Sequence, residues 1–239
     1  MKSLFPLSLL LIIITLFGCS QEYTITGSIN GAIDGDSVIL GYSTDGVDFT
    51  VTDRTVIENG QFHFSGKTDG SKIYYIGYEQ SIEPMYLLFF LEGGNISINM
   101  SGEESTVNGT PSNDLNTEIE GHIMKYVNRM LGADFQLQMD EELSDSAIAQ
   151  LELTISEARR DAMQYIKGMI EDNNESIVSL YMLVQYSDLF TIEELEQLSD
   201  KIPSENIDRS NNCLYDILIE TINERKRIDT QLPEEDQEW

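Results

Sequence analysis

The sequence predicts an α+β protein with segregated halves, in which an N-terminal antiparallel β-sandwich is followed by an all-α helical domain. Two observations predict this order. Up to about residue 108, short runs of alternating apolar and polar residues are separated by glycine-containing turns, a pattern typical of antiparallel sandwiches. From about residue 110 onward, apolar residues instead recur every three or four positions, which is the period of a helix.

The N-terminal segment is typical of an export signal. Lys2 supplies a positive charge, and the apolar stretch after it is shorter than the roughly 20 residues that a transmembrane helix needs. The stretch ends at Leu16-Phe17-Gly18-Cys19, which resembles the lipobox of bacterial lipoproteins, although Phe17 is bulkier than the residue usual at that position. The resemblance implies cleavage before Cys19 and acylation of this cysteine with three chains. The alternative is an ordinary secretory signal in which Cys19 is incidental.

The residue after the cysteine bears on location. It is Ser20 rather than an aspartate, which by the same resemblance implies sorting to the outer membrane of a Gram-negative envelope. Two or more acyl chains anchor a protein stably where one chain is marginal. We therefore expect the mature protein to be held at a membrane through Cys19, on either the periplasmic face or the cell surface.

Seven strands are expected in the β half. The dipeptide Asn59-Gly60 between two extended runs predicts a hairpin, because both central residues of a type I′ turn need a positive φ. Asp34-Gly35-Asp36 could be either a turn or the start of a calcium-binding loop. We predict a turn, because the further oxygen ligands of a calcium loop do not follow it. The expected strands are residues 23–29, 37–42, 53–57, 61–64, 73–78, 85–91 and 95–100.

Five helices are expected in the second half. Thr110 supplies a capping hydroxyl before Pro111 at the first helical position, and Asp114 lies in the first turn, where the helix dipole favours it. Thr191 and Glu194 have the spacing of a capping box. The first two helices carry apolar stripes that predict an antiparallel pair. The expected helices begin near residues 111, 145, 177, 192 and 211.

These patterns divide the chain into five parts. They are a lipoprotein signal peptide over residues 1–18, a lipidated tether over 19–22, a β-sandwich over 23–108, a helical domain over 110–230 and an acidic tail over 231–239. The tail is expected to be disordered.

The charge excludes one class of partner. The chain has 42 acidic and 14 basic residues and a formal net charge of −28. Such a surface repels phosphate backbones, so we expect no nucleic-acid binding. It is also repelled by anionic lipid, so the acyl anchor must provide the attachment to the membrane.

The sequence contains no catalytic constellation that we can assign. Only two cysteines occur, so Cys213 has no internal partner once Cys19 is lipidated, and we expect it to be buried in a helix rather than redox-active. His63 is expected to be exposed or cross-strand, and His122 to lie at the edge of a helical core. They belong to different domains and predict neither a zinc site nor a base. We therefore expect no metal and no cofactor.

Three segments resemble a known family. They are the first strand pair over residues 25–40, the junction over 108–114, and residues 176–195. They resemble lipoproteins of Gram-negative bacteria whose N-terminal β module is domain of unknown function 4369. In that family, a helical segment and then a thioredoxin-like domain of thiol-disulfide oxidoreductase type typically follow. This chain ends where the redox domain would begin and has no Cys-x-x-Cys, so the resemblance implies the accessory region without the oxidoreductase activity.

Two short motifs resemble the O-glycosylation acceptor of exported proteins in the same bacterial group. They are centred on Ser146, in the polar entry to a helix, and on Ser37, within a predicted strand. Ser146 is the stronger candidate, because glycosylation requires an accessible side chain.

Three functions follow as hypotheses. We prefer a non-catalytic, membrane-anchored interaction module of the cell envelope, acting as an accessory to a protein with a thioredoxin fold. The second hypothesis is a lipoprotein that binds peptide or glycan between its domains, because domain junctions often form pockets. The third and weakest is a hydrolase that uses paired carboxylates, since some pair among 42 acidic residues will always have a suitable spacing.

Overall fold

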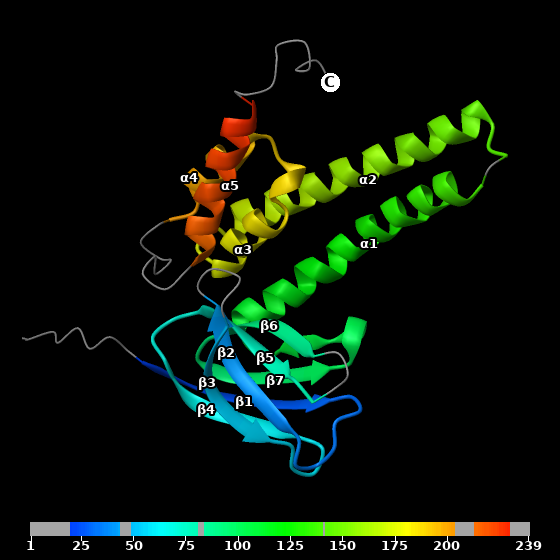
Figure 1. Ribbon diagram of the computed structural model, residues 1–239. Coiled ribbons are helices and arrows are strands. Elements are labelled where there is room, and N and C mark those ends of the chain that lie inside the picture. Colours follow the sequence, from blue (N-terminus) through cyan, green and yellow to red (C-terminus); the bar gives the residue numbers. More distant parts are fainter. Residues whose placement is uncertain (1–19, 44–48, 81–83, 141, 204–212, 230–239) are drawn as a thin grey trace, which may run out of the picture.

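A computed structural model of the chain describes residues 20–43, 49–80, 84–140, 142–203 and 213–229. A β-sandwich carries a cluster of helices on one side, and two long helices extend from this body as a hairpin (Figure 1). The α+β class is confirmed, with the strands preceding the helices. Among the described residues, no helix is long and apolar enough to cross a membrane.

The sandwich consists of two four-stranded sheets. One has the strand order β4-β1-β7-β8 and the other has the order β3-β2-β5-β6. The strands are β1 (Gln21–Ile29), β2 (Ser37–Ser43), β3 (Phe49–Val56), β4 (Phe62–Thr68), β5 (Lys72–Tyr78), β6 (Met85–Leu91), β7 (Gly94–Met100) and β8 (Thr106–Asn108).

The sandwich is not wholly antiparallel. β1 pairs with β4 in the antiparallel sense but with β7 in the parallel sense, with Ile25 opposite Ile96 and Gly27 opposite Ile98. The prediction of an antiparallel sandwich is therefore wrong for this pair. Alternation of apolar and polar residues reveals which face of a strand is buried, but it contains no information on the direction of the neighbouring strand.

The predicted turn at Asn59-Gly60 is confirmed, but its hairpin is minimal. The φ angles are 53° at Asn59 and 75° at Gly60, as a type I′ turn requires. The Asp34 carboxylate accepts both backbone N–H groups of this turn, at 3.0 and 2.9 Å. A single bridge between Glu58 and Gln61 closes the turn. The strands on either side of it, β3 before and β4 after, belong to different sheets. Asp34 therefore fastens one turn to another.

The predicted helices are confirmed, with one correction at a cap. The Thr191–Glu194 capping box is present. Thr110 precedes the first helix in an extended conformation, but its hydroxyl makes no capping bond to the backbone and instead accepts the Asn113 side-chain N–H. The helices are α1 (Pro111–Met139), α2 (Asp145–Asp172), α3 (Ile177–Gln185), α4 (Ile192–Lys201) and α5 (Cys213–Asp229).

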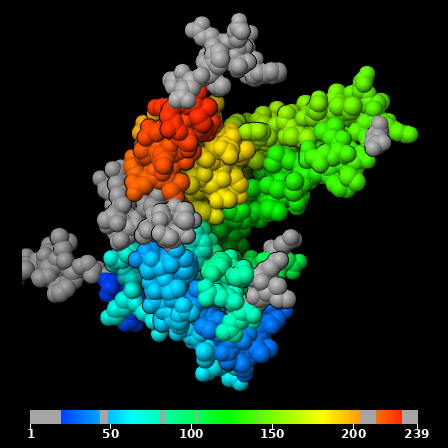
Figure 2. Space-filling model, in the orientation of Figure 1, coloured from blue at the N-terminus to red at the C-terminus, as the bar shows by residue number. Residues whose placement is uncertain are grey.

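The α1–α2 hairpin leaves the body of the protein (Figure 2). Near α3, its apolar stripe is covered, with Ile119, Ile123 and Ile166 buried. Farther out, the two helices have only each other to pack against. Consequently Leu131 and Phe135 remain 59% and 63% exposed.

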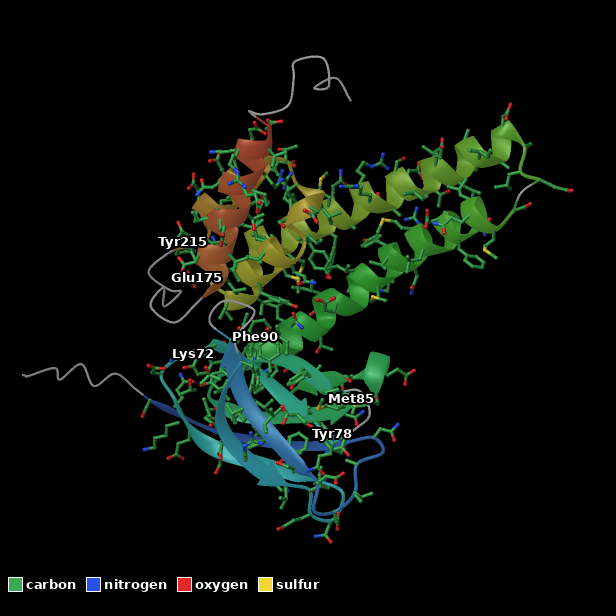
Figure 3. All side chains as sticks on the ribbon, in the orientation of Figure 1. Lys72, Tyr78, Met85, Phe90, Glu175 and Tyr215 are labelled. Atoms are coloured by element: carbon green, nitrogen blue, oxygen red, sulfur yellow. The ribbon has the colours of Figure 1, made fainter. Side chains whose placement is uncertain are left out.

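Strand β6 contributes to two hydrophobic cores. Phe89 and Leu91 point between the two sheets, whereas Phe90 points to the other side and packs among the helices (Figure 3). The rings of Phe90 and Tyr181 meet edge to face, with centroids 5.6 Å apart. The sheet that contains β6 is therefore buried on both faces here, and the sandwich and the helices share a continuous apolar contact.

Gly109, between β8 and α1, has a backbone conformation that residues with a side chain rarely adopt. Its φ is +101°, and an added Cβ would collide with the Asn95 carbonyl oxygen. We expect Gly109→Ala to lower the free energy of unfolding by about 2–4 kcal/mol, from strain and overlap together. Urea denaturation measures this change. Gly132→Ala in α1 is the matched control, because no atom beyond its chain neighbours and the helix's own backbone lies within 4 Å of the added methyl, and it should raise stability by about 0.5–1 kcal/mol. Equal changes in unfolding free energy for the two variants would contradict the strain and close contact assigned to Gly109.

Candidate functional site

The first turn of α1 is hydrogen-bonded to the edge of the sheet. Asn113 is 2% exposed, and its side chain binds both backbone groups of Phe90. The Phe90 N–H donates to Asn113 Oδ1 at 2.9 Å, and Asn113 Nδ2 donates to the Phe90 carbonyl at 2.8 Å. One side-chain amide thus replaces the neighbouring strand that β6 lacks on this side.

The N-terminus of α1 is capped by the carboxylate of Glu92, the residue that directly follows β6. Glu92 accepts the Ser112 N–H at 2.7 Å and the Ser112 hydroxyl at 2.8 Å. A carboxylate at this position satisfies a free helix donor and interacts favourably with the helix dipole. Asn113 and Glu92 together fix α1 against the sheet.

The first two turns of α1 are also fastened on the side of the other sheet. Asp114 accepts the Gly109 N–H at 2.7 Å, and the Thr117 hydroxyl donates to the Val107 carbonyl in β8, also at 2.7 Å. The junction over residues 108–114 therefore has a structural role, and it connects α1 to the edges of both sheets.

We call the hydrogen-bonded attachment of α1 to the two sheets through Asn113, Glu92 and Thr117 the joint. A pocket lies beside this joint. It has a volume of about 360 Å³ and opens to solvent between the edge strands β6 and β8, with α1 and α3 as its remaining walls. It therefore exists only because the helices are attached to the sandwich. Its lining residues are Leu87, Leu88, Ser105, Thr106, Val107, Asn116, Thr117, Glu120, Gly121, Met124 and Tyr181.

A partly buried carboxylate is the main ionisable group of the pocket. Burial raises the pKa of Glu120, and the hydrogen bond that its Oε2 accepts from the Tyr186 hydroxyl at 2.9 Å opposes this rise. Burial together with the charge of Glu120 raises the pKa of Tyr181 to about 12 and also raises the pKa of Tyr186. Both hydroxyls thus stay protonated at neutral pH.

Two hydrogen-bond acceptors in the pocket have no partner within the described part of the chain. Asn116 Oδ1 is buried without a hydrogen bond. Glu120, one turn later, uses Oε2 for Tyr186, and no described group binds its Oε1. Leaving the buried Asn116 oxygen unsatisfied costs about 1–3 kcal/mol, whereas Glu120 Oε1 is not among the buried atoms that lack a partner. The pocket is therefore suited to a ligand that donates hydrogen bonds.

The residues singled out from the sequence lie elsewhere. Cys19 is outside the described residues, and Cys213 begins α5, but its side chain is not described. Ser146 is exposed in the first turn of α2, whereas Ser37 begins β2 and is half-buried. These predictions remain predictions, and neither serine is near the pocket.

The histidines and the acidic turn are also separate from the pocket. His63 is exposed and faces Thr26 across the β1–β4 pair, with Nδ1 and Oγ1 3.2 Å apart, as expected. His122 is exposed and stacks on Tyr165, which packs against the helical core, so its expected place at the edge of this core is confirmed. The Asp36 carboxylate accepts the Ile33 N–H and the Tyr78 hydroxyl. Among the described residues, no three His, Cys, Asp or Glu side chains are grouped so that they could hold a metal ion.

The comparison with protein families identifies the β half. Residues 23–116 match the model of a domain of unknown function, DUF4369. This part of the chain is similar to that domain family. The match to DUF4369 extends beyond the strands to the second turn of α1, so it includes the joint at Asn113 and the pocket residue Asn116. No curated protein and no solved structure matches the chain.

Reasoning from the sequence alone anticipated a pocket between the two halves but named none of its lining residues. Asn116 and Glu120 are separated by four positions on a helix, which places them on one face, but neither residue differs from the surrounding polar residues in type. The available signal was the apolar run over residues 87–91, which does not alternate and is typical of a strand buried on both faces.

Two identical substitutions in consecutive turns of α1 should have opposite effects. Asn113→Ala leaves the Phe90 N–H and carbonyl buried without partners and should lower the free energy of unfolding by about 2–4 kcal/mol. Asn116→Ala removes an acceptor that has no partner and should leave stability unchanged or raise it by up to about 1 kcal/mol. Chemical denaturation of both variants measures these changes. A loss at Asn116 as large as that at Asn113 would contradict this account.

Glu120 should make stability depend on pH. Because its pKa is raised in the folded state, the folded protein binds this proton more tightly than the unfolded chain does. The resulting stabilisation is complete below the ordinary pKa of 4.5 and is lost as the pH rises through the raised value. Glu120→Gln, which cannot ionise, should therefore gain stability relative to the native protein between pH 4 and pH 7.

The measurement is the difference in unfolding free energy between Glu120→Gln and the native protein across this pH range. Tyr186→Phe supplies a second comparison, because removal of its hydrogen bond should raise the pKa of Glu120 further and move the transition to higher pH. A difference that is independent of pH would show that the Glu120 carboxyl is as well solvated as in the unfolded chain.

Proposed function

We propose that this protein is a lipid-anchored lipoprotein of the cell envelope that acts as a non-catalytic interaction module and binds part of a partner protein in the junction pocket. The pocket is the observation that carries the proposal. It combines apolar walls with a few polar groups and lies where two structural units meet, as ligand sites commonly do. A thioredoxin-fold protein of the envelope is the proposed partner, because of the family that the chain resembles.

The joint supports this proposal, because it pre-forms the pocket. Asn113, Glu92 and Thr117 fix α1 to both sheets through hydrogen bonds of 2.7–2.9 Å. A site held in shape before binding loses less conformational entropy when the ligand arrives. This arrangement is favourable for a protein whose role is to bind.

The second candidate is a glycan-binding lipoprotein. Glu120 could accept hydrogen bonds from sugar hydroxyls, and Tyr181 adds an aromatic ring to the same pocket. Saturable binding of small oligosaccharides by the mature protein, measured by calorimetry, would favour this candidate over a protein partner.

The anchor has a direct test. Protein extracted from membranes should lack residues 1–18 and have an intact mass increased by the acyl chains on Cys19. Cys19→Ala should abolish the added mass and release the protein from the membrane fraction, because no other attachment is proposed. An unmodified mature N-terminus in membrane-extracted protein would overturn the lipoprotein assignment.

The partner is tested by photo-crosslinking in native membranes. A photoreactive amino acid replaces Met124, which lines the pocket and is 47% exposed. The matched control is Val56, which is 45% exposed. It lies on β3, at the opposite edge from β6 of the sheet that borders the pocket. We expect reproducible capture of an envelope protein at Met124 and not at Val56. Recovery of a Cys-x-x-Cys protein would support the accessory role, and equal labelling at both positions would count against the pocket as the site.

A further inference from the structure

Strand β6 has a free edge that faces the pocket. It is the last strand of its sheet and pairs with β5 on one side only. On the other side, Asn113 takes both backbone groups of Phe90. The peptide groups of an edge strand are available to pair with another chain unless something covers them.

The position of Phe90 fixes the direction of its neighbours. In an antiparallel pair, every second residue directs both its N–H and its carbonyl away from the partner strand. Because Phe90 faces Asn113, Leu88 and Tyr86 direct their backbone groups to the same open side. No hydrogen bond to these groups occurs from the described residues on this side, and Leu88 lines the pocket.

Helix α1 diverges from the strand where these groups become free. Asn113 touches β6, but one turn later Thr117 bonds to β8 instead. Asn116 and Glu120 therefore face β6 across the pocket, which separates the helix from the strand edge. A row of backbone donors and acceptors on β6 is thus opposed by the Glu120 carboxylate on α1.

We propose that the junction pocket binds an extended peptide segment, which adds a strand to β6 at Leu88 and directs a lysine or arginine side chain to Glu120. This inference rests on the proposed function and specifies its ligand. Main-chain pairing satisfies the edge of β6, a mode of recognition that depends little on sequence. The selective element is the basic side chain.

The charge of the site favours a basic side chain. Burial raises the pKa of Glu120, so the carboxylate lacks the stabilisation that water would provide. Within the described part of the chain, no lysine or arginine forms an ion pair with Glu120. A ligand cation would supply this partner. The overall charge of −28 would attract such a segment.

The experiment begins with a library of random heptapeptides displayed on phage, selected on the full mature protein in detergent. Selected sequences are made as fluorescent peptides, and their affinity is measured by anisotropy. Each backbone nitrogen is then methylated in turn. We expect alternate positions to lose about tenfold or more in affinity, because only every second N–H of an added strand faces β6. Losses without this period of two would overturn the strand addition.

Variants of the protein test the same contacts from the other side. Leu88→Pro removes the outward N–H at an edge position, where proline can be accommodated, and Leu88→Val keeps this N–H as its control. Glu120→Gln should weaken a lysine-containing peptide about tenfold, and replacing this lysine with norleucine should remove the difference. If Leu88→Pro does not fold, the methylated peptides still decide. An unchanged affinity of Glu120→Gln for every selected peptide would overturn the role of the basic side chain.

The outcomes separate this inference from the proposed function. If photo-crosslinking from Met124 captures a partner but no heptapeptide is enriched, strand addition is wrong and the partner binds through a folded surface. If an oligosaccharide such as chitotriose binds and leaves the exchange rate of the Leu88 amide hydrogen unchanged, the protein is a glycan-binding lipoprotein. Both the protein partner and the added strand are then wrong. Slowed exchange of the Leu88 amide on adding a selected peptide is the result expected for an added strand.

Discussion

The pair of hydrogen bonds between Asn113 and the Phe90 peptide group is the constraint on which the rest of the structure depends. A sheet edge that enters an apolar interface would leave a buried N–H and carbonyl unsatisfied, and this would oppose burial of the Phe90 ring among the helices. A single side-chain amide satisfies both groups at once and occupies little space. It thereby permits the two hydrophobic cores to join, and the start of α1 is fixed by the same contact.

The joint also explains how a small sandwich can support a large helical attachment. Phe90 contributes its ring to the helical core, while Phe89 on the same strand contributes to the sandwich core. Neither half can shift without disturbing packing in the other, because interiors are close-packed and respond to changes of a single methylene. The pocket between β6, β8 and α1 is the space that remains where this contact ends. Its shape is thus determined by the joint rather than by a mobile loop.

Local signals predicted the elements, but the site depends on contacts between distant residues. The Asn59-Gly60 turn and the Thr191–Glu194 capping box are each encoded within a few positions, so the sequence was sufficient for both. Asn113 appears in the sequence as one more polar residue in a first turn, and its partner Phe90 lies 23 positions away. The parallel pairing of β1 with β7 likewise joins residues about 70 positions apart, and no local pattern encodes its direction. Glu120 is one of 42 acidic residues and is distinguished only by its burial.

The length and continuity of α1 have a mechanical consequence. At a rise of about 1.5 Å per residue, its 29 residues extend about 43 Å from the joint to the tip of the hairpin. The pocket residues Asn116 and Glu120 lie near the fixed end of this rod, and the exposed Leu131 and Phe135 lie in its outer half. The helix is thus a lever with its fulcrum at Asn113. A displacement of a few ångströms at the tip would be reduced several-fold at the pocket, so the wall beside β6 is shielded from movements of the outer hairpin.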